Sequence, residues 1–315
     1  MARRLLAIVG PTATGKTEVG ILLAEALEGE VVSADSMQVY RGMDIGTAKP
    51  TREERARVPH HLIDIIAPDE PFSVADYQAR AGAALVNIWE RGRQPILVGG
   101  SGLYARAALY ELDLPLAPPL PELRERLTEE ARAKGSEALH ARLREVDPEA
   151  AARIHANDEK RIVRALEVYE QTGKPISSLQ ALDRRRKLRY NTRQFGLTLP
   201  RDEMYRRIEE RVDRMMAEGL GDEVRGLLAQ GYGEDLISMR GLGYAQLIPY
   251  LRGEIGREEA ARRLKRDTRR FAKRQLTWFR ADPGIEWVDA AEVGGPEGAA
   301  ELIGKRWERE CSGEA

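Results

Sequence analysis

Two hydrophobic periods alternate along the first hundred residues of the chain. Short apolar runs that end in Gly, Ser or Asp are typical of buried strands, whereas the longer segments between them have the 3.6-residue period of amphipathic helices. Strands that alternate with helices predict a parallel sheet covered on both faces. The predicted strands are residues 5–9, 30–34, 62–66 and 95–98, and the predicted helices are residues 16–27, 73–89 and a third from Leu103.

The pattern changes to nearly continuous helix after a proline-rich break at residues 114–121. We therefore expect an α/β fold with three parts: a P-loop NTPase-like core that begins in residues 1–114, an all-helical insertion over residues 115–189, and a continuation of the core in residues 190–315. The predicted helices of the second half are residues 122–134, 136–145, 149–154, 158–171, 201–218, 222–229 and 258–279, with strands at 194–199 and 285–288 and a closing helix.

Composition excludes several classes of protein. The 315 residues include 42% hydrophobic and 32% charged residues, which is typical of a folded chain and not of collagen, a coiled coil or a disordered protein. No apolar run approaches the roughly 18–20 residues that cross a bilayer. Cys311 is the single cysteine, which excludes a disulfide framework and a cysteine zinc site. We expect a cytoplasmic protein with no membrane contact.

Basic residues are concentrated in one predicted helix although the whole chain is balanced. The chain has 50 Lys and Arg against 51 Asp and Glu, but residues 257–280 contain ten basic side chains and three acidic ones. Phe271, Trp278 and Phe279 lie among them. Basic stripes with interleaved aromatic residues indicate a nucleic-acid partner. A solvated helix face in an arginine-rich chain is the alternative interpretation.

One motif carries clear chemistry. Gly10-Pro-Thr-Ala-Thr-Gly-Lys-Thr17 matches the P-loop pattern, and it lies directly between a predicted strand and a predicted helix. Its backbone N–H groups surround an anion and the helix N-terminus adds positive potential. Lys16 would reach the terminal phosphate oxygens and Thr17 would ligate Mg²⁺. The motif predicts a polyphosphate or diphosphate ligand without saying what reaction follows.

The acidic residue that holds the metal ion in nucleotide hydrolases is missing from its usual place. The strand at residues 95–98 ends in Gly99-Gly-Ser101-Gly, where a hydrolase would have an Asp that holds the metal. Asp35 ends the neighbouring strand instead. Because the carboxyl ends of parallel strands face one crevice, Asp35 should lie across it from Lys16, where it could act as a general base. A helix cap or a structural hydrogen-bond acceptor is the alternative role for Asp35.

Several segments resemble the bacterial tRNA dimethylallyltransferase family, and the resemblance runs nearly from end to end. Asp-Ile-Gly-Thr-Ala-Lys-Pro at residues 44–50 is specific to that family rather than to P-loop proteins in general. The other matching segments are the P-loop, Asp35-Ser-Met-Gln-Val-Tyr40, Val98-Gly-Gly-Ser-Gly-Leu-Tyr104, Ala152-Arg-Ile-His-Ala-Asn-Asp158, Arg161–Val168, Ser238-Met-Arg-Gly-Leu-Gly-Tyr244 and Lys273-Arg-Gln-Leu-Thr-Trp-Phe-Arg280.

The resemblance implies transfer of a dimethylallyl group from dimethylallyl diphosphate to N6 of adenine 37 in the anticodon arm of tRNA, with Mg²⁺ as cofactor. It implies that Asp35, Lys16 and Thr17 are catalytic, with Thr17 at the metal. The substrate-binding residues it implies are Gly10, Pro11, Thr12, Ala13, Thr14, Gly15, Lys16, Thr17, Ser101, Arg211 and Arg240. The tRNA contacts it implies are Asp35, Ser36, Met37, Gln38, Ser101, Arg124, Lys160, Arg161, Arg164, Lys273, Arg274, Gln275, Trp278 and Arg280.

The residues leave other interpretations open. Arg211 and Arg240 would neutralise phosphate of the tRNA or of the diphosphate, or form surface salt bridges, and Trp278 would stack on a base or pack in the core. His60 and His61 favour a loop or strand role over catalysis. A small-molecule or nucleoside kinase shares the P-loop and an acid after the second strand, a prenyltransferase of free adenine nucleotides is a closer alternative, and a non-catalytic RNA-binding module is a third. We expect a monomer.

Overall fold

The chain forms two compact units. The computed structural model describes residues 3–111, 120–178 and 187–312. The core unit comprises Met1–Leu109 and Tyr190–Ala315, and the helical unit comprises Tyr110–Arg189. The insertion was expected over residues 115–189, and residue 115 itself lies outside the described part of the chain.

Six parallel strands form the sheet of the core unit, in the order β3-β2-β4-β1-β5-β6. The central strand β1 is apolar and buried along most of its length, as expected of a strand covered on both faces. Its Ile8 pairs with Val98 on one side and with Phe195 on the other. The carboxyl ends of β1, β2 and β4 therefore meet at one edge. The strands are β1 (Arg4–Val9), β2 (Gly29–Ser33), β3 (His60–His61), β4 (Gln94–Gly99), β5 (Asn191–Thr198) and β6 (Ile285–Asp289).

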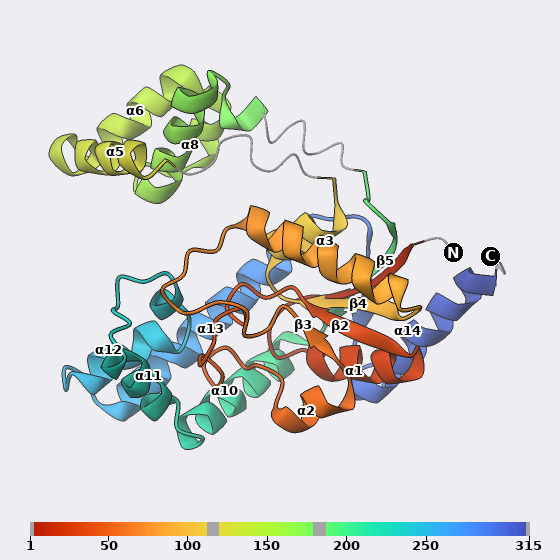
Figure 1. Ribbon diagram of the computed structural model, residues 1–315. Helices are drawn as coiled ribbons and strands as arrows, with labels where there is room; N and C mark the ends of the chain where they lie inside the picture. The colour runs from red at the N-terminus through yellow and green to blue at the C-terminus, as the bar shows by residue number, and fades with distance from the viewer. Residues whose placement is uncertain (1–2, 112–119, 179–186, 313–315) are drawn as a thin grey trace. The chain divides into compact units, whose positions relative to one another are not determined.

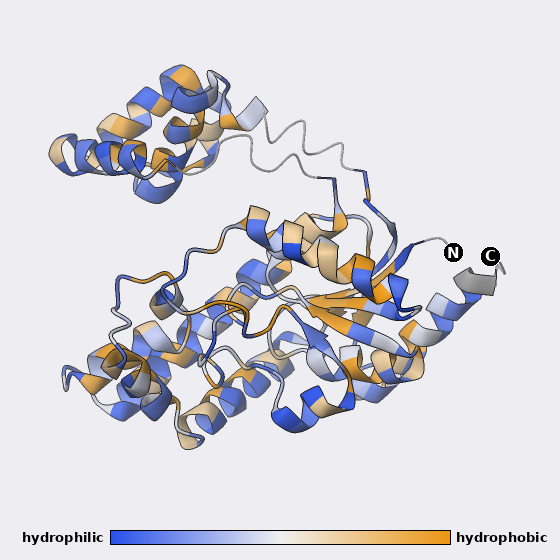
Figure 2. Cartoon of the chain, in the orientation of Figure 1, coloured by the Kyte–Doolittle hydropathy of each residue, from blue (hydrophilic) through white to orange (hydrophobic). Residues whose placement is uncertain are grey.

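Helices cover both faces of this sheet (Figure 1). On one face, α1 (Lys16–Ala26) packs with α14 (Gly295–Ser312), and on the other α3 (Val74–Glu90) packs with α4 (Gly102–Leu109). Ser73 and Asp76 form the capping box predicted for the start of α3. Figure 2 shows the apolar residues gathered in the strands between these helices. The predicted α/β fold is confirmed.

Four helices beyond the sheet continue the core unit. In α13 the buried residues recur every three or four positions, so its basic residues are left on the outer side. This helix packs against α10 and α12, and α11 packs against both of these neighbours. The helices are α10 (Arg201–Ala217), α11 (Leu220–Ala229), α12 (Tyr244–Leu251) and α13 (Arg257–Arg280), with a short 3₁₀ turn at Ser238–Arg240.

The helical unit has a hydrophobic core of its own. Leu127, Leu143, Ile162 and Leu166 are fully buried in it. Glu167 is also fully buried, and its carboxylate accepts hydrogen bonds from Arg124, Arg164 and the backbone N–H of Leu120. The helices are α5 (Pro121–Lys134), α6 (Ser136–Val146), α7 (Pro148–Arg153) and α8 (Glu159–Thr172), close to the predicted bounds.

The strand predicted at residues 62–66 is wrong. The pairing with β2 is limited to His60 and His61, because Leu62 and Asp64 have φ of 63° and 58° and turn the chain away from β2. Ile66 makes only an isolated bridge with Tyr40. The sequence analysis also missed α12 and α2 (Arg52–Arg57). Helix α2 buries no residue, so it has no apolar period, and α12 contains Pro249. Among the described residues, no helix combines the length and the apolar character needed to cross a bilayer.

Candidate active site

A cavity of about 380 Å³ opens at the carboxyl edge of the sheet. The loops that follow β1, β2 and β4 line one part of it, and α10, α13 and the segment before α12 line another, with His60 and Ile63 beside them. Of the predicted site residues, the cavity wall contains Thr12, Lys16, Thr17, Asp35, Ser36, Met37, Gln38, Ser101, Arg211, Arg240 and Gln275. Residues from distant parts of the core unit thus meet in one place.

The P-loop is held in the form that an anion site requires. Gly10 has a φ of 135°, and a Cβ on it would lie 2.5 Å from the carbonyl oxygen of Leu197, so only glycine fits. Thr14 is fully buried, and its hydroxyl donates to the carbonyl of Pro11 at 2.9 Å. Gly15 precedes α1 and has no side chain to cap it, which leaves the first N–H groups of the helix for a ligand. Gly10, Pro11, Ala13, Thr14 and Gly15 shape the loop behind the cavity wall.

Lys16 and Asp35 both line the cavity, and each influences the charge of the other. Burial and the neighbouring Arg211 lower the pKa of Lys16 to about 7, and Asp35 partly opposes this. Burial raises the pKa of Asp35, although the N–H groups of Met37 and Gln38 and the charge of Lys16 act against the shift. Met37 N donates to Asp35 Oδ1 at 2.8 Å, which fixes the carboxylate. Groups with such shifted pKa values are typical of catalytic sites.

The glycine-rich turn after β4 brings α13 to the P-loop. Gln275 is buried, accepts from the N–H of Thr12 at 2.9 Å and donates to the carbonyl of Gly100 at 2.9 Å. A Cβ on Gly100 would lie 2.4 Å from the side-chain nitrogen of Gln275. Its side-chain amide thus bridges two loops of the cavity wall, and the expected contact of Gln275 with tRNA stays a prediction.

Ser101 connects the turn after β4 to the loop that carries Asp35. Its hydroxyl oxygen accepts from the N–H of Ser36 at 2.9 Å and donates to the Ser36 hydroxyl at 3.1 Å. Ser101 occupies the place where a hydrolase has its metal-binding Asp. Its hydroxyl instead positions the segment that begins with Asp35.

Two arginines lie on the α10 and α12 side of the cavity. Arg211 is on α10, donates to the Thr12 hydroxyl at 3.1 Å, and has its pKa lowered by burial. Arg240 is exposed and also lines the cavity. Beside them, the wall becomes apolar, with Val212, Met215, Leu242, Leu264 and Phe271. The cavity thus has a cationic end next to an apolar wall.

Other predicted tRNA contacts lie outside the cavity wall. Lys273, Arg274 and Arg280 are exposed on α13, and Trp278 is 45% exposed beside Gly102. Arg124, Lys160, Arg161 and Arg164 belong to the helical unit, where Arg124 and Arg164 bind Glu167 and Arg161 pairs with Asp158.

Sequence reasoning missed several residues of the cavity wall. His60 lines it, and since its Nδ1 lies 2.9 Å from the carbonyl of Val58, Nδ1 must donate and Nε2 is left as an acceptor. In the part of the chain that the structure describes, this Nε2 is buried without a partner. Leu264 and Thr268 belong to the buried stripe of α13, and the half-buried Phe271 lines the cavity with them. The period of the helix shows that it has a buried face but not what that face contacts.

Comparison with known proteins agrees with this geometry. The family model "IPP transferase" matches residues 38–282. The chain is 55% identical over 302 residues to a tRNA dimethylallyltransferase of Desulforudis audaxviator, with 95% of this chain and 96% of the relative covered. It is 53% identical over 286 residues to the tRNA dimethylallyltransferase of Geobacter sulfurreducens, with 91% and 92% covered.

Solved structures are also similar. A full-length tRNA isopentenylpyrophosphate transferase from Bacillus halodurans matches with a TM-score of 0.70 at 45% identity, over 99% of both chains. A eukaryotic dimethylallyltransferase acting on tRNA matches with a TM-score of 0.75 at 27% identity, over 91% of this chain and 73% of the other. With the P-loop and Asp35 in one cavity and these relatives over nearly its whole length, the chain belongs to the IPP transferase family of tRNA dimethylallyltransferases.

Proposed function

We propose that this protein transfers a dimethylallyl group from dimethylallyl diphosphate to N6 of adenine 37 in the anticodon arm of tRNA, in the cytoplasm. The observation that carries the proposal is the meeting of a diphosphate loop, an acid with a raised pKa and an apolar wall in one cavity. The membership of the family supports the same reaction.

The cationic end of the cavity fits the diphosphate. The P-loop, with the N-terminus of α1 behind it, would surround the anion, and Lys16 and Arg211 would neutralise charge as the diphosphate leaves. Arg240 reaches the same cavity and would add positive charge on the tRNA or diphosphate side. The apolar wall around Val212, Leu264 and Phe271 suits a five-carbon hydrocarbon group, which offers no hydrogen bonds.

Asp35 fits the role of a general base. The N6 lone pair attacks the allylic carbon, the carbon–oxygen bond to the diphosphate breaks, and the N6 proton passes to the Asp35 carboxylate. An exocyclic amine is a poor nucleophile because its lone pair is delocalised, so proton removal during attack contributes typically ~10²–10⁴-fold. The bond from Met37 N holds Asp35 for this task.

The donor set also fits Mg²⁺. In residues 3–111, 120–178 and 187–312 no three His, Cys, Asp or Glu side chains gather to hold a metal. Mg²⁺ commonly needs only one or two protein oxygens, together with substrate phosphates and waters. Thr17 lines the cavity beside Lys16 and would supply such an oxygen. When bound, the ion would neutralise charge on the leaving diphosphate.

A direct assay separates this function from a kinase. Unmodified tRNA is incubated with labelled dimethylallyl diphosphate or with γ-labelled ATP, and the nucleosides of the tRNA are then analysed. We expect label on adenine 37 with the prenyl donor and no transfer from ATP. ATP-dependent labelling of a small metabolite, with no prenylated adenosine, would instead assign the protein to the kinases.

A further inference from the structure

The connection from β2 to α2 forms much of the cavity wall with little regular structure of its own. Its cavity-lining residues are Asp35, Ser36, Met37, Gln38, Gly46, Thr47, Ala48 and Pro50. Between Asp35 and Pro50 the chain has one isolated bridge, from Tyr40 to Ile66, and no strand or helix. Backbone hydrogen bonds to residues 64–66 hold residues 38–41, and side chains contribute the further contacts described below.

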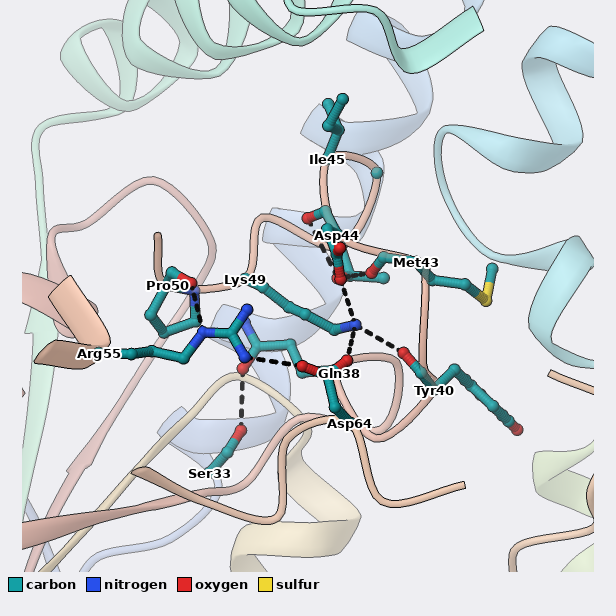
Figure 3. Close-up of polar contacts among 12 residues, drawn as sticks. Ser33, Gln38, Tyr40, Met43, Asp44, Ile45, Lys49, Pro50, Arg55 and Asp64 are labelled. Atoms are coloured by element: carbon teal, nitrogen blue, oxygen red, sulfur yellow. Dashed lines mark hydrogen bonds and ion pairs between the residues drawn. The ribbon is translucent and has the colours of Figure 1, made fainter. Parts of the chain in front are cut away.

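Lys49 binds several parts of the connection (Figure 3). Its side chain is 1% exposed, and its ammonium group donates to Tyr40 O at 2.6 Å, Asp44 Oδ1 at 2.6 Å and Asp64 Oδ1 at 2.5 Å. An ammonium group has three protons, so each has an acceptor. Lys49, near the end of the connection, therefore joins Tyr40 and Asp44 in its middle to the segment that contains Asp64.

Asp64 extends this contact to the backbone beside Gln38. Its second carboxylate oxygen accepts from Arg55 Nη1 at 2.7 Å, and its N–H donates to the carbonyl of Gln38 at 3.1 Å. Arg55 also donates to the carbonyl of Pro50 at 3.0 Å. The Gln38 carbonyl is thus bonded to the backbone of the same residue whose carboxylate Lys49 holds.

Glu223 of α11 is the second residue that binds the connection. Its carboxylate accepts from three consecutive backbone N–H groups, those of Asp44, Ile45 and Gly46, at 2.9, 2.7 and 3.1 Å. It also accepts from the hydroxyl of the buried Tyr244 at 2.6 Å. A Cβ on Gly46 would lie 2.6 Å from the Tyr244 ring, so the turn packs directly on α12. Asp44 therefore contacts both residues: its N–H donates to Glu223, and its carboxylate accepts from Lys49.

The side chain of Gln38 contacts the turn that Lys49 and Glu223 hold. Gln38 Oε1 accepts from the Ser33 hydroxyl at 2.9 Å, and Nε2 donates to the carbonyl of Ala48 at 3.3 Å, next to Lys49. Both bonds leave one amide proton and one lone pair. A side-chain amide with a free donor and a free acceptor is suited to bidentate recognition of adenine.

We propose that Lys49 and Glu223 are positioning residues for the nucleobase side of the cavity. They hold the Asp44–Lys49 turn through the carboxylate and the N–H of Asp44, and so fix the Ala48 carbonyl that orients the Gln38 amide. The proposal rests on the proposed function, because it takes the nucleobase as the ligand on that side. The P-loop is held by other contacts, such as Thr12 with Gln275, and should not depend on this turn.

The test uses Lys49→Met, Glu223→Gln and Tyr244→Phe, each alone and combined with Gln38→Ala. We measure kcat/KM for tRNA, the dissociation constant of inorganic diphosphate, and Tm. We expect kcat/KM for tRNA to fall about 10-fold in the first two variants and less in the third, as for a lost hydrogen bond to a charged group. Diphosphate binding should stay within about twofold. Since the residues act through Gln38, the kcat/KM of each double variant should be about as low as that of the more impaired of its two single variants, and not lower.

Arg91→Met is the matched control, because Arg91 also pairs with a buried carboxylate, that of Glu30, at the opposite edge of the sheet. It should lower Tm and leave kcat/KM for tRNA unchanged. The proposal is overturned if Lys49→Met and Glu223→Gln behave like this control, if diphosphate affinity falls along with kcat/KM, or if their effects multiply with that of Gln38→Ala. A wild-type protein that transfers no prenyl group overturns the proposed function itself, and with it this inference.

Discussion

The core unit and the helical unit present their functional candidates in different ways. In the core unit, residues from three strand ends and two distant helices converge on a cavity, where burial lowers the pKa of Lys16 and raises that of Asp35. In the helical unit, Arg124 and Arg164 lie on the surface, and both are held by the buried Glu167. The core unit is therefore suited to chemistry, and the helical unit presents fixed positive charge.

Alterations in the two units should therefore cause different kinds of loss. A buried group with a shifted pKa acts on the reaction step, so its removal should change a rate. An exposed cation acts on association, so its removal should change an affinity and its salt dependence. A buried carboxylate that binds arginines acts first on stability.

Asp35→Asn should give the largest effect. It removes the general base and keeps the shape, so the single-turnover transfer rate at saturating tRNA should fall by at least ~10²-fold. The wild-type rate should rise with pH through the pKa of Asp35, which burial raises, because only the ionised carboxylate accepts a proton. The variant should lose this rise. A near-normal rate would give Asp35 a structural role instead.

Replacement of Lys273, Arg274 and Arg280 by Gln should weaken tRNA binding. If all three contact phosphates, the slope of log K against log salt should shrink by roughly two units, since each contact contributes about 0.7–0.9. Diphosphate binding without tRNA should not change, because the P-loop is untouched. An unchanged slope with a lower Tm would show that this face of α13 is a solvated surface with a structural role only.

Glu167→Gln should act on the helical unit alone. The change keeps the volume but removes the charge that binds Arg124 and Arg164, so we expect a loss of about 1–3 kcal/mol in local stability. Hydrogen exchange of the amides in α5 and α8 measures this loss, and exchange in β1 and β4 should not change. Glu170→Gln, which alters a more exposed ion pair of the same unit, is the matched control. Equal exchange in both variants would contradict the special role of the buried carboxylate.

Proton uptake on diphosphate binding should be the smallest signal, less than one proton per site. The pKa of Lys16 is about 7 in the free protein, so at pH 8 its amine is neutral in most of the molecules. Bound diphosphate raises this pKa, and Lys16 then takes up a proton. Calorimetry at pH 8 in buffers of different ionisation enthalpy measures the uptake. Lys16→Met should abolish it, and equal uptake in that variant would assign the proton to another group.

Local patterns explain why much of the fold and part of the site were predictable. The apolar runs of β1 and β4, the capping box at Ser73 and the amphipathic period of α13 depend on residues close together in sequence. The P-loop could be placed for the same reason. The turn at Leu62 and Asp64 could not, because non-glycine residues there adopt positive φ only with tertiary support, in part from the contact of Asp64 with Lys49.

Most strands and helices, the diphosphate loop and the position of Asp35 after β2 could be read from the sequence, since periodicity and motif spacing are local properties. Folding was needed to bring Gln275 between the P-loop and the turn after β4, His60 and Phe271 to the cavity, and Glu223 to the turn at Asp44. These contacts join residues far apart in the chain. Their physical reason is long-range packing, which gives buried polar groups such as the N–H of Thr12 their partners and leaves no periodic trace in the sequence.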